Sequence, residues 1–156
     1  INVLNKIAEH YNFNNLFNKN TNILSDEKSP LEKELKHIKK HFSKESLIDI
    51  FNSLENDNTE WAKNTLKVLS QKSPTSMSVT TRQLSEAIKL NLKDCLNMEF
   101  RICQTMMAKH DFYEGVRSVL VDKDHSPTWS PSNINLVSEE IVEEHFKSLG
   151  TEDLIL

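Results

Sequence analysis

The chain has 156 residues, of which 37% are hydrophobic, a formal charge of −4, and only two glycines, Gly115 and Gly150. A dinucleotide-binding Rossmann turn needs three closely spaced glycines, and a Walker phosphate loop needs two at a fixed spacing. The sequence therefore excludes both motifs. The scarcity of glycine also disfavours an all-β fold with many tight turns, and the acidic balance disfavours a nucleic-acid-binding surface.

The sequence also limits membrane, disulfide and metal chemistry. No apolar run approaches the ~20 residues of a membrane span, which predicts a soluble protein without membrane contact. Cys95 and Cys103 are separated by about 12 Å along a predicted helix, too far for a disulfide bond. His37 and His41 share a helix face at a spacing that can hold zinc, but no third ligand accompanies them. We therefore interpret them as surface histidines and expect no metal site.

Helix starts are marked by capping residues that precede apolar residues three or four positions apart. The expected caps, in chain order, are Ser29, Ser43, Asp57, Ser73, Asn91, Asp111 and Ser138. They predict helices over 29–42, 43–54, 57–69, 73–90, 91–109, 111–120 and 138–149, with Gly150 ending the last, and residues 1–10 also look helical. The sequence thus predicts an all-α fragment of seven or eight helices.

Two helices have clear apolar patterns. In the helix over 43–54 we expect Leu47, Ile48, Phe51 and Leu54 to form the buried face. In the helix over 91–109 apolar side chains, among them the pair Met106 and Met107, cover more than half of the circumference. Such a pattern predicts a central helix that is buried on several sides, with the methionines as core residues.

The chain is expected to have two regions. Residues 1–42 contain the first helices and an asparagine-rich loop over 12–25, and residues 43–156 form the main helical region. Within the second region, residues 122–137 contain Pro127 and Pro131 and show no helical periodicity, which predicts an extended strap.

The segment before this strap contains the candidate functional residues. Gly115 lies inside a predicted helix, where glycine costs up to about 1 kcal/mol relative to alanine, so we expect close approach by a backbone or a ligand. Arg117 and Lys123 form a basic pair that could bind a phosphorylated ligand. The alternative is a salt bridge with a neighbouring carboxylate, from Glu114, Asp122 or Asp124.

The residues alone indicate no catalytic centre. His110 and Asp111 are adjacent and could form a catalytic pair, but a helix cap explains Asp111 better. No nucleophile–base arrangement, paired carboxylates or metal cluster emerges elsewhere. The sequence therefore indicates a helical module whose chemistry lies in another part of the protein.

Several segments resemble a known family. They are 73–76 (SPTS), 81–84 (TRQL), 92–101 (LKDCLNMEFR), 110–123 (HDFYEGVRSVLVDK) and 124–131 (DHSPTWSP), which carries Trp129. Together they resemble the C-terminal part of the 3-hydroxyisobutyryl-CoA hydrolases, a branch of the enoyl-CoA hydratase/isomerase (crotonase) superfamily. The Glu-Gly pair at 114–115 followed by Asp-Lys is shared across the superfamily, and the Ser-Pro-x-Trp-x-Pro strap is more particular to the hydrolases. The match is strong from about residue 41 to 149.

The resemblance implies hydrolysis of a 3-hydroxyacyl-CoA thioester in mitochondrial valine breakdown. It also implies that the oxyanion-hole donors and catalytic acids lie in an N-terminal spiral core of β-β-α turns that is absent from this chain. No catalytic residue can therefore be assigned here, and no cofactor is implied beyond the CoA of the substrate. The helical region would pack on its own N-terminal core, contribute subunit contacts in a homo-oligomer, and help to enclose the CoA. Lys123 and Arg117 are the expected contacts for the CoA phosphates.

Two alternatives remain open at this stage. Members of this family have also been recruited as noncatalytic components of mitochondrial ribosomes. A free-standing helical interaction module would instead be monomeric and would unfold cooperatively.

Overall fold

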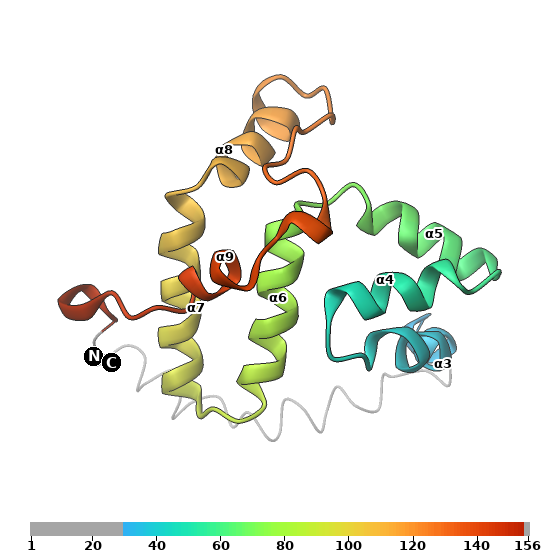
Figure 1. Ribbon diagram of the computed structural model, residues 1–156, viewed down its shortest axis with the longest axis horizontal. Helices are drawn as coiled ribbons and strands as arrows, with labels where there is room; N and C mark the ends of the chain where they lie inside the picture. Colours follow the sequence, from blue (N-terminus) through green and yellow to red (C-terminus); the bar gives the residue numbers. More distant parts are fainter. Residues whose placement is uncertain (1–29, 155–156) are drawn as a thin grey trace, which may run out of the picture. The chain divides into compact units, whose positions relative to one another are not determined.

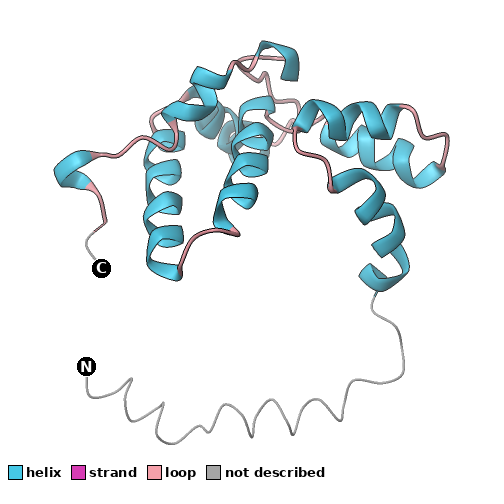
Figure 2. Ribbon diagram, turned by 60° about the horizontal axis from the view of Figure 1, so that its bottom comes forward, coloured by secondary structure: helices cyan, strands magenta, loops and turns pink. Residues whose placement is uncertain are grey.

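A computed structural model describes residues 30–154 of the chain, and these residues are helical without a strand (Figures 1 and 2). The α-helices in this range are α3 (Pro30–Phe42), α4 (Leu47–Glu55), α5 (Glu60–Leu69), α6 (Pro74–Ala87), α7 (Leu92–Met107), α8 (His110–Val116) and α9 (Glu139–Glu144). A π-helical turn, η2 (Arg117–Val121), continues α8, and η3 (Ile134–Leu136) and η4 (Gly150–Glu152) are short 3₁₀-helices. The all-α prediction is confirmed for this range. The predicted helix over 1–10 and loop over 12–25 lie outside the described residues.

The chain divides into two compact units, Ile1–Lys39 and Lys40–Leu156. The described part of the first unit consists of residues 30–39, which lie in α3. All contacts discussed below lie within the second unit. No helix over residues 30–154 has the length and apolar character needed to cross a membrane.

Three predicted caps are confirmed. Ser73, Asn91 and Ser138 each accept a backbone hydrogen bond from the residue three positions later, at the starts of α6, α7 and α9. Each satisfies a backbone N–H that has no partner inside the helix. Proline follows Ser73 at the first position of α6, where its missing N–H costs nothing.

Three other caps and the helix terminator were predicted wrongly. α4 is capped by Ser46 rather than Ser43, and α5 by Thr59 rather than Asp57. Asp111 does not cap α8, because the N-cap position is Lys109 and no side chain bonds there. Gly150 adopts a positive φ of 65°, but it begins η4 after α9 has ended at Glu144.

The first apolar cluster joins α4 to α5. Ile50, Leu54 and Ala62 are its buried members, and Trp61, Leu66 and Leu69 pack around them. Ile48, which was predicted to be buried, is 46% exposed, because the turn of α4 that faces α5 carries Ile50 instead.

The second apolar cluster joins α6, α7 and α9. Its buried members are Val79, Met98 and Ile102, and Met106, Val142 and Phe146 pack against them. The prediction of α7 as a helix buried on several sides is wrong for the described residues. Met98 and Ile102 are its buried side chains, whereas Leu92 is 76% exposed and Met107 is also exposed. One face of α7 packs on α6 and α9, which lie beside it in Figure 1. Much of its apolar side-chain surface is exposed.

Both cysteines are free thiols on α7, where Cys95 is half-buried and Cys103 is exposed. The interpretation of His41 as a surface residue is wrong, because its side chain is 0% exposed. Its ring stacks on Trp61, with 5.8 Å between ring centroids. The residues over 30–154 contain no group of three or more His, Cys, Asp or Glu side chains placed to hold a metal ion.

Candidate functional site

The candidate site lies where α8 ends and the chain turns back along it. The Asp122 N–H donates to the Arg117 carbonyl over 2.8 Å, which closes the π-helical turn η2. Lys123 and His125 then adopt positive φ angles of 57° and 52°. Such backbone is uncommon outside glycine and is held only where surrounding contacts fix it. The turn therefore places residues 122–128 beside Arg117 rather than carrying the helix onward.

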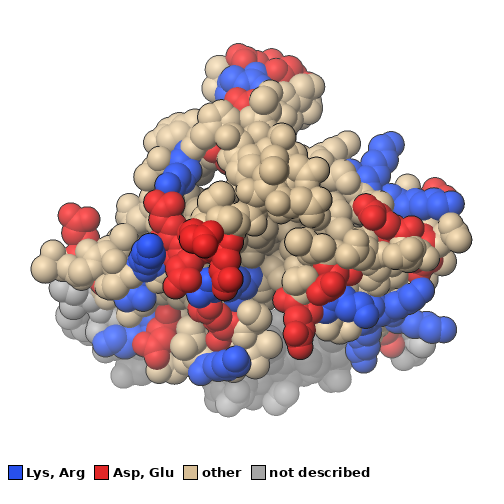
Figure 3. Space-filling model, viewed as in Figure 1, with Lys and Arg blue, Asp and Glu red and all other residues tan. Residues whose placement is uncertain are grey.

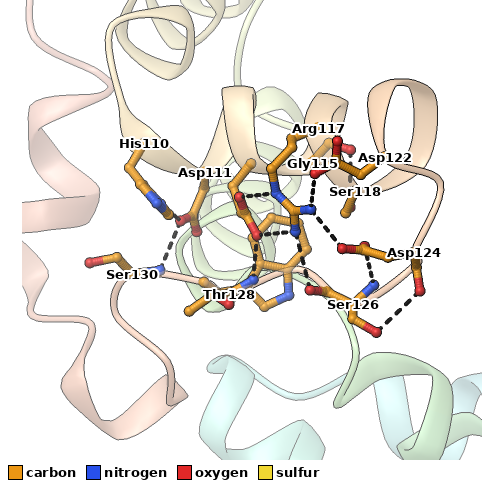
Figure 4. A network of polar contacts seen from close by, with 12 residues as sticks. His110, Asp111, Gly115, Arg117, Ser118, Asp122, Asp124, Ser126, Thr128 and Ser130 are labelled. Carbon is orange, nitrogen blue, oxygen red and sulfur yellow. Dashed lines mark hydrogen bonds and ion pairs between the residues drawn. The ribbon is translucent and has the colours of Figure 1, made fainter.

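Arg117 is the centre of this turn (Figure 4). Its Nε and Nη2 donate to the two oxygens of Glu114, each over 2.8 Å. Its Nη1 donates to Asp122 over 2.7 Å and to Asp124 over 2.6 Å, and Nη2 also donates to the Ser126 carbonyl. A guanidinium has five N–H donors, and here each has an acceptor. The predicted salt bridge is thus present with all three candidate carboxylates.

Glu114 accepts a hydrogen bond from the strap in addition to those from Arg117. Its Oε1 accepts the Thr128 backbone N–H over 2.6 Å. These bonds favour the carboxylate form: the hydrogen bond from Arg117, followed by that from the Thr128 backbone, lowers the pKa of Glu114 from 4.5 to about 2. The hydrogen bonds that Arg117 donates to Glu114 are the main cause that raises the pKa of Arg117 above its ordinary value.

Asp111 connects the strap to α6. Its side chain is buried, and its Oδ2 accepts the Ser73 hydroxyl over 2.5 Å. Its Oδ1 accepts the Ser130 backbone N–H over 2.8 Å and lies 3.0 Å from Nδ1 of His110. The two side chains of the disfavoured His110–Asp111 pair are therefore within hydrogen-bond distance. Because Asp111 also binds Ser73 and Ser130, its position indicates a structural junction rather than a catalytic dyad.

Gly115 faces the side chain of Trp129 in the strap. A Cβ atom built at this position would lie 3.5 Å from Cη2 of Trp129, which is an ordinary van der Waals contact. The expected close approach by a backbone or a ligand is therefore not seen among the described residues, and the space at Gly115 would also admit an alanine. The Trp129 indole N–H also donates to the Gln71 carbonyl over 3.0 Å, so the strap is tied to the end of α5 through the Gln71 backbone.

The two predicted CoA contacts differ in their surroundings. Arg117 has no guanidinium N–H left without an acceptor, and it sits among three carboxylates. Lys123 is exposed and has no ion pair with any residue over 30–154. Figure 3 shows basic and acidic side chains close together at the top of the view, where Figure 1 places α8 and the loop that follows it. Lys123 is therefore the cation of this turn that is available to an anionic ligand.

A second polar cluster was missed from the sequence. Nδ1 of His41 lies 2.9 Å from the Ser53 hydroxyl, and Nε2 lies 3.0 Å from Oδ2 of Asp57. Asp57 also binds Lys40 over 2.6 Å and the Thr59 backbone, and the Lys40 hydrogen bond is the main cause that lowers the pKa of Asp57. The order serine–histidine–aspartate matches that of a hydrolytic triad, but the imidazole is fully buried beneath Trp61. The cluster fixes the end of α3 to the α4–α5 turn. The available indication of this cluster in the sequence was Asp57, which the sequence pattern assigned to a helix cap.

Acidification should weaken the turn through Glu114. Because the folded pKa of about 2 is below the ordinary 4.5, the ionised carboxylate stabilises the fold above about pH 5, and this contribution is lost as pH falls toward 2. We expect Glu114→Gln to lower the melting temperature by a few degrees at pH 7 and by much less at pH 3. Thermal unfolding followed by circular dichroism measures both. Glu55→Gln, at an exposed position of α4, controls for the loss of one negative charge. An equal effect of Glu114→Gln at both pH values would contradict the assignment.

Comparison with known proteins gives a consistent result. The family model described as enoyl-CoA hydratase/isomerase matches residues 2–146. The chain is 44% identical to the human mitochondrial 3-hydroxyisobutyryl-CoA hydrolase over 124 residues, which cover 80% of this chain and 32% of that protein. It is 40% identical to the Gallus gallus protein of the same name over 142 residues, covering 91% of this chain and 37% of the relative. The chain thus spans about a third of the length of these relatives.

Solved structures agree with this assignment. An enoyl-CoA hydratase from Rhodobacter sphaeroides superposes with a TM-score of 0.77 at 27% identity, covering 85% of this chain and 39% of that one. A carnitinyl-CoA dehydratase from Mycobacterium thermoresistibile superposes with a TM-score of 0.74 at 28% identity, covering 80% of this chain and 36% of that one. Family match, sequence identity and helical fold all point the same way, and the chain belongs to the enoyl-CoA hydratase/isomerase family.

Proposed function

We propose that this chain is the helical C-terminal part of a mitochondrial hydrolase that cleaves the thioester of 3-hydroxyisobutyryl-CoA. The observation that carries the proposal is the 44% identity to the human mitochondrial 3-hydroxyisobutyryl-CoA hydrolase over 80% of the chain. At that identity this chain and the matching part of the relative should share one helical fold. A shared fold does not by itself establish an activity, which depends on the residues of a site. The reaction is therefore assigned to the complete protein, with the catalytic residues outside this chain.

The uncovered apolar surface supports a role as a docking part of a larger protein. Apolar side chains that are at least half exposed include Leu84, Ile88, Leu92, Val119, Leu120 and Val121. Exposed apolar patches of this kind mark surfaces that bind protein or another apolar partner. The remaining two thirds of the protein, which would carry the catalytic core, are the proposed partner, with further contacts between subunits of a homo-oligomer.

Within this function, Lys123 is the proposed contact for a CoA phosphate, and Arg117 shapes the turn that presents it. Asp122 and Asp124, on either side of Lys123, are held by their hydrogen bonds from Arg117, and Lys123 itself has a positive φ. Direct phosphate binding by Arg117 requires the ligand to displace a carboxylate. No further cofactor is proposed, since CoA belongs to the substrate.

The function is tested by measuring CoA release from 3-hydroxyisobutyryl-CoA with a thiol reagent. The full-length protein should turn the substrate over, and residues 1–156 alone should show no activity. Lack of turnover by the full-length protein would overturn the proposed reaction. In that case co-sedimentation with mitochondrial ribosomal subunits would favour a noncatalytic role. Turnover by residues 1–156 alone would show that our placement of the catalytic groups is wrong.

The Lys123→Ala variant tests the phosphate contact. We expect KM for the CoA thioester to rise about fivefold with kcat unchanged, because the ammonium binds the phosphate equally well in the ground state and the transition state, and its removal costs about 1 kcal/mol in both. Steady-state kinetics of the full-length protein measure both constants. Lys89→Ala, at an exposed position beyond α6, should leave KM unchanged. An unchanged KM for Lys123→Ala would contradict the proposed role of Lys123.

A further inference from the structure

A groove lies over α6, which contacts α4, α9 and η3. Its volume is about 490 Å³, within the range of about 300–1,000 Å³ that is typical of ligand pockets in proteins. Its apolar lining comes from α4, η3, the residue after η3 and α9: Leu47, Ile48, Ile134, Val137 and Val142. Ile48 is 46% exposed, so this lining is open to solvent and accessible to the side chains of a partner.

Two carboxylates of the groove have no partner. Glu45 precedes α4 and Glu139 begins α9, and both side chains are exposed. Neither forms an ion pair or a side-chain hydrogen bond with any residue over 30–154. Figure 1 shows α4 and α9 on either side of α6, so the two carboxylates belong to different walls of the groove. Figure 3 shows acidic side chains gathered over α9 on this face.

The helix starts do not account for these two carboxylates. A negative charge in the first turn offsets the helix dipole, and each of the two helices has another acid in that place. In α4 it is Asp49, which accepts the Ser46 hydroxyl over 2.6 Å. In α9 it is Glu140, whose pKa is lowered by a hydrogen bond from the Ser138 side chain. Glu45 and Glu139 are therefore additional negative charges.

The cation of the groove is already matched. Nε of Arg82 donates to Glu86 over 2.6 Å, and Nη1 lies 4.0 Å from Glu143. The guanidinium carbon also lies 4.7 Å from the centroid of the Phe146 ring. Because Arg82 has carboxylate partners of its own, Glu45 and Glu139 leave the groove with an excess of negative charge. Charge complementarity thus favours a cationic partner.

The walls also restrict the backbone of a partner. The wall elements α4, α6, α9 and η3 are helical, and helices use most of their backbone N–H and C=O groups internally. Residues 30–154 contain no strand whose edge could pair with an extended peptide. A peptide in the groove must therefore satisfy its own backbone groups, as a helix does.

We propose that this groove binds a basic amphipathic helix of another protein. Its apolar face packs on Ile48, Ile134 and Val142, and its lysine or arginine side chains lie opposite Glu45 and Glu139. A second copy of this chain fits less well, because its own groove would bring the same two carboxylates to the interface. The interaction goes beyond the proposed hydrolase function and does not involve the turn at Lys123.

The test uses two synthetic peptides with a fluorescent label. One is an amphipathic peptide of leucine and lysine, and in the other every lysine is replaced by glutamate. Fluorescence anisotropy measures the binding of each to the full-length protein. We expect saturable binding of the lysine peptide, which weakens as salt is added, and no binding of the glutamate peptide.

Variants of the two carboxylates test the charge of the groove. The double variant Glu45→Gln/Glu139→Gln should bind the lysine peptide about fivefold more weakly, the effect of losing two exposed ion pairs. The matched control is Glu55→Gln/Glu152→Gln, which removes two exposed carboxylates outside the groove and should leave binding unchanged.

A second pair of variants tests the apolar lining. Ile48→Ala should weaken binding of the lysine peptide at least threefold, whereas Val68→Ala, at an exposed position of α5, should have no effect. No saturable binding, as when a second copy or the rest of the protein covers the groove, would overturn the proposal. Equal binding of the two peptides, or binding that neither Ile48→Ala nor the double variant weakens, would overturn it as well.

Discussion

Leu54→Ala should destabilise the protein by about 3 kcal/mol, one of the two largest effects that we expect from a single substitution. Leu54 is 1% exposed and lies in the apolar cluster that joins α4 to α5. Removing its branched end leaves a cavity that Ile50 and Ala62 cannot fill, because both are held by their own helices. Urea unfolding of the full-length protein, followed by circular dichroism, measures the loss.

Ile48 provides the matched control on the same helix. Its side chain is 46% exposed, so Ile48→Ala removes little buried surface, and we expect a change below about 1 kcal/mol. Both positions fit one apolar pattern in the sequence, and only the packing of α5 distinguishes them. Equal destabilisation by the two variants would show that α4 packs with a different face.

The sequence predicted local structure more reliably than tertiary contacts. Ser73, Asn91 and Ser138 cap their helices as expected, because a cap depends on a hydrogen bond only three residues away. Asp57 and Asp111 also have the residue type of a cap. Both are buried and bind side chains that come from other elements, Lys40 and Ser73 respectively. Residue type alone does not separate these two uses of a short carboxylate.

In the candidate site, too, the sequence predicted the local contact and missed the contact between distant residues. The ion pair of Glu114 and Arg117 spans three residues and was an expected alternative. Trp129 donates to the backbone of Gln71 across 58 residues and packs on Gly115, a pairing that no local pattern specifies. The burial of α7 was overestimated for a physical reason: apolar side chains over most of a helix predict burial, whether the partner lies in the same chain or in a part outside it.

Substitution of Asp111 should destabilise the fold as much as substitution of Leu54, because Asp111 accepts hydrogen bonds from two other segments. Asp111→Ala removes the acceptor of both the Ser73 hydroxyl and the Ser130 N–H, at a position that is 8% exposed. Leaving the buried Ser73 hydroxyl without a partner costs about 1–3 kcal/mol, and the lost charge-assisted hydrogen bond from the N–H of the exposed Ser130 adds to this, so we expect a total loss of about 3 kcal/mol in urea unfolding of the full-length protein. Asp111→Asn keeps the shape but faces one of these donors with an amide N–H, so it should recover only part of that loss.

The control is Asp122→Asn, which weakens an exposed ion pair with Arg117 and should cost less than about 1 kcal/mol. Because Asp111 holds the strap at Ser130 while Glu114 holds it at Thr128, releasing one anchor leaves the other in place. Asp111→Asn should therefore destabilise the fold more than it disturbs the turn that presents Lys123. In the full-length protein its KM for the CoA thioester should stay within about twofold of the parent. A KM increase as large as that of Lys123→Ala would instead show that the junction at Asp111 positions the phosphate contact directly.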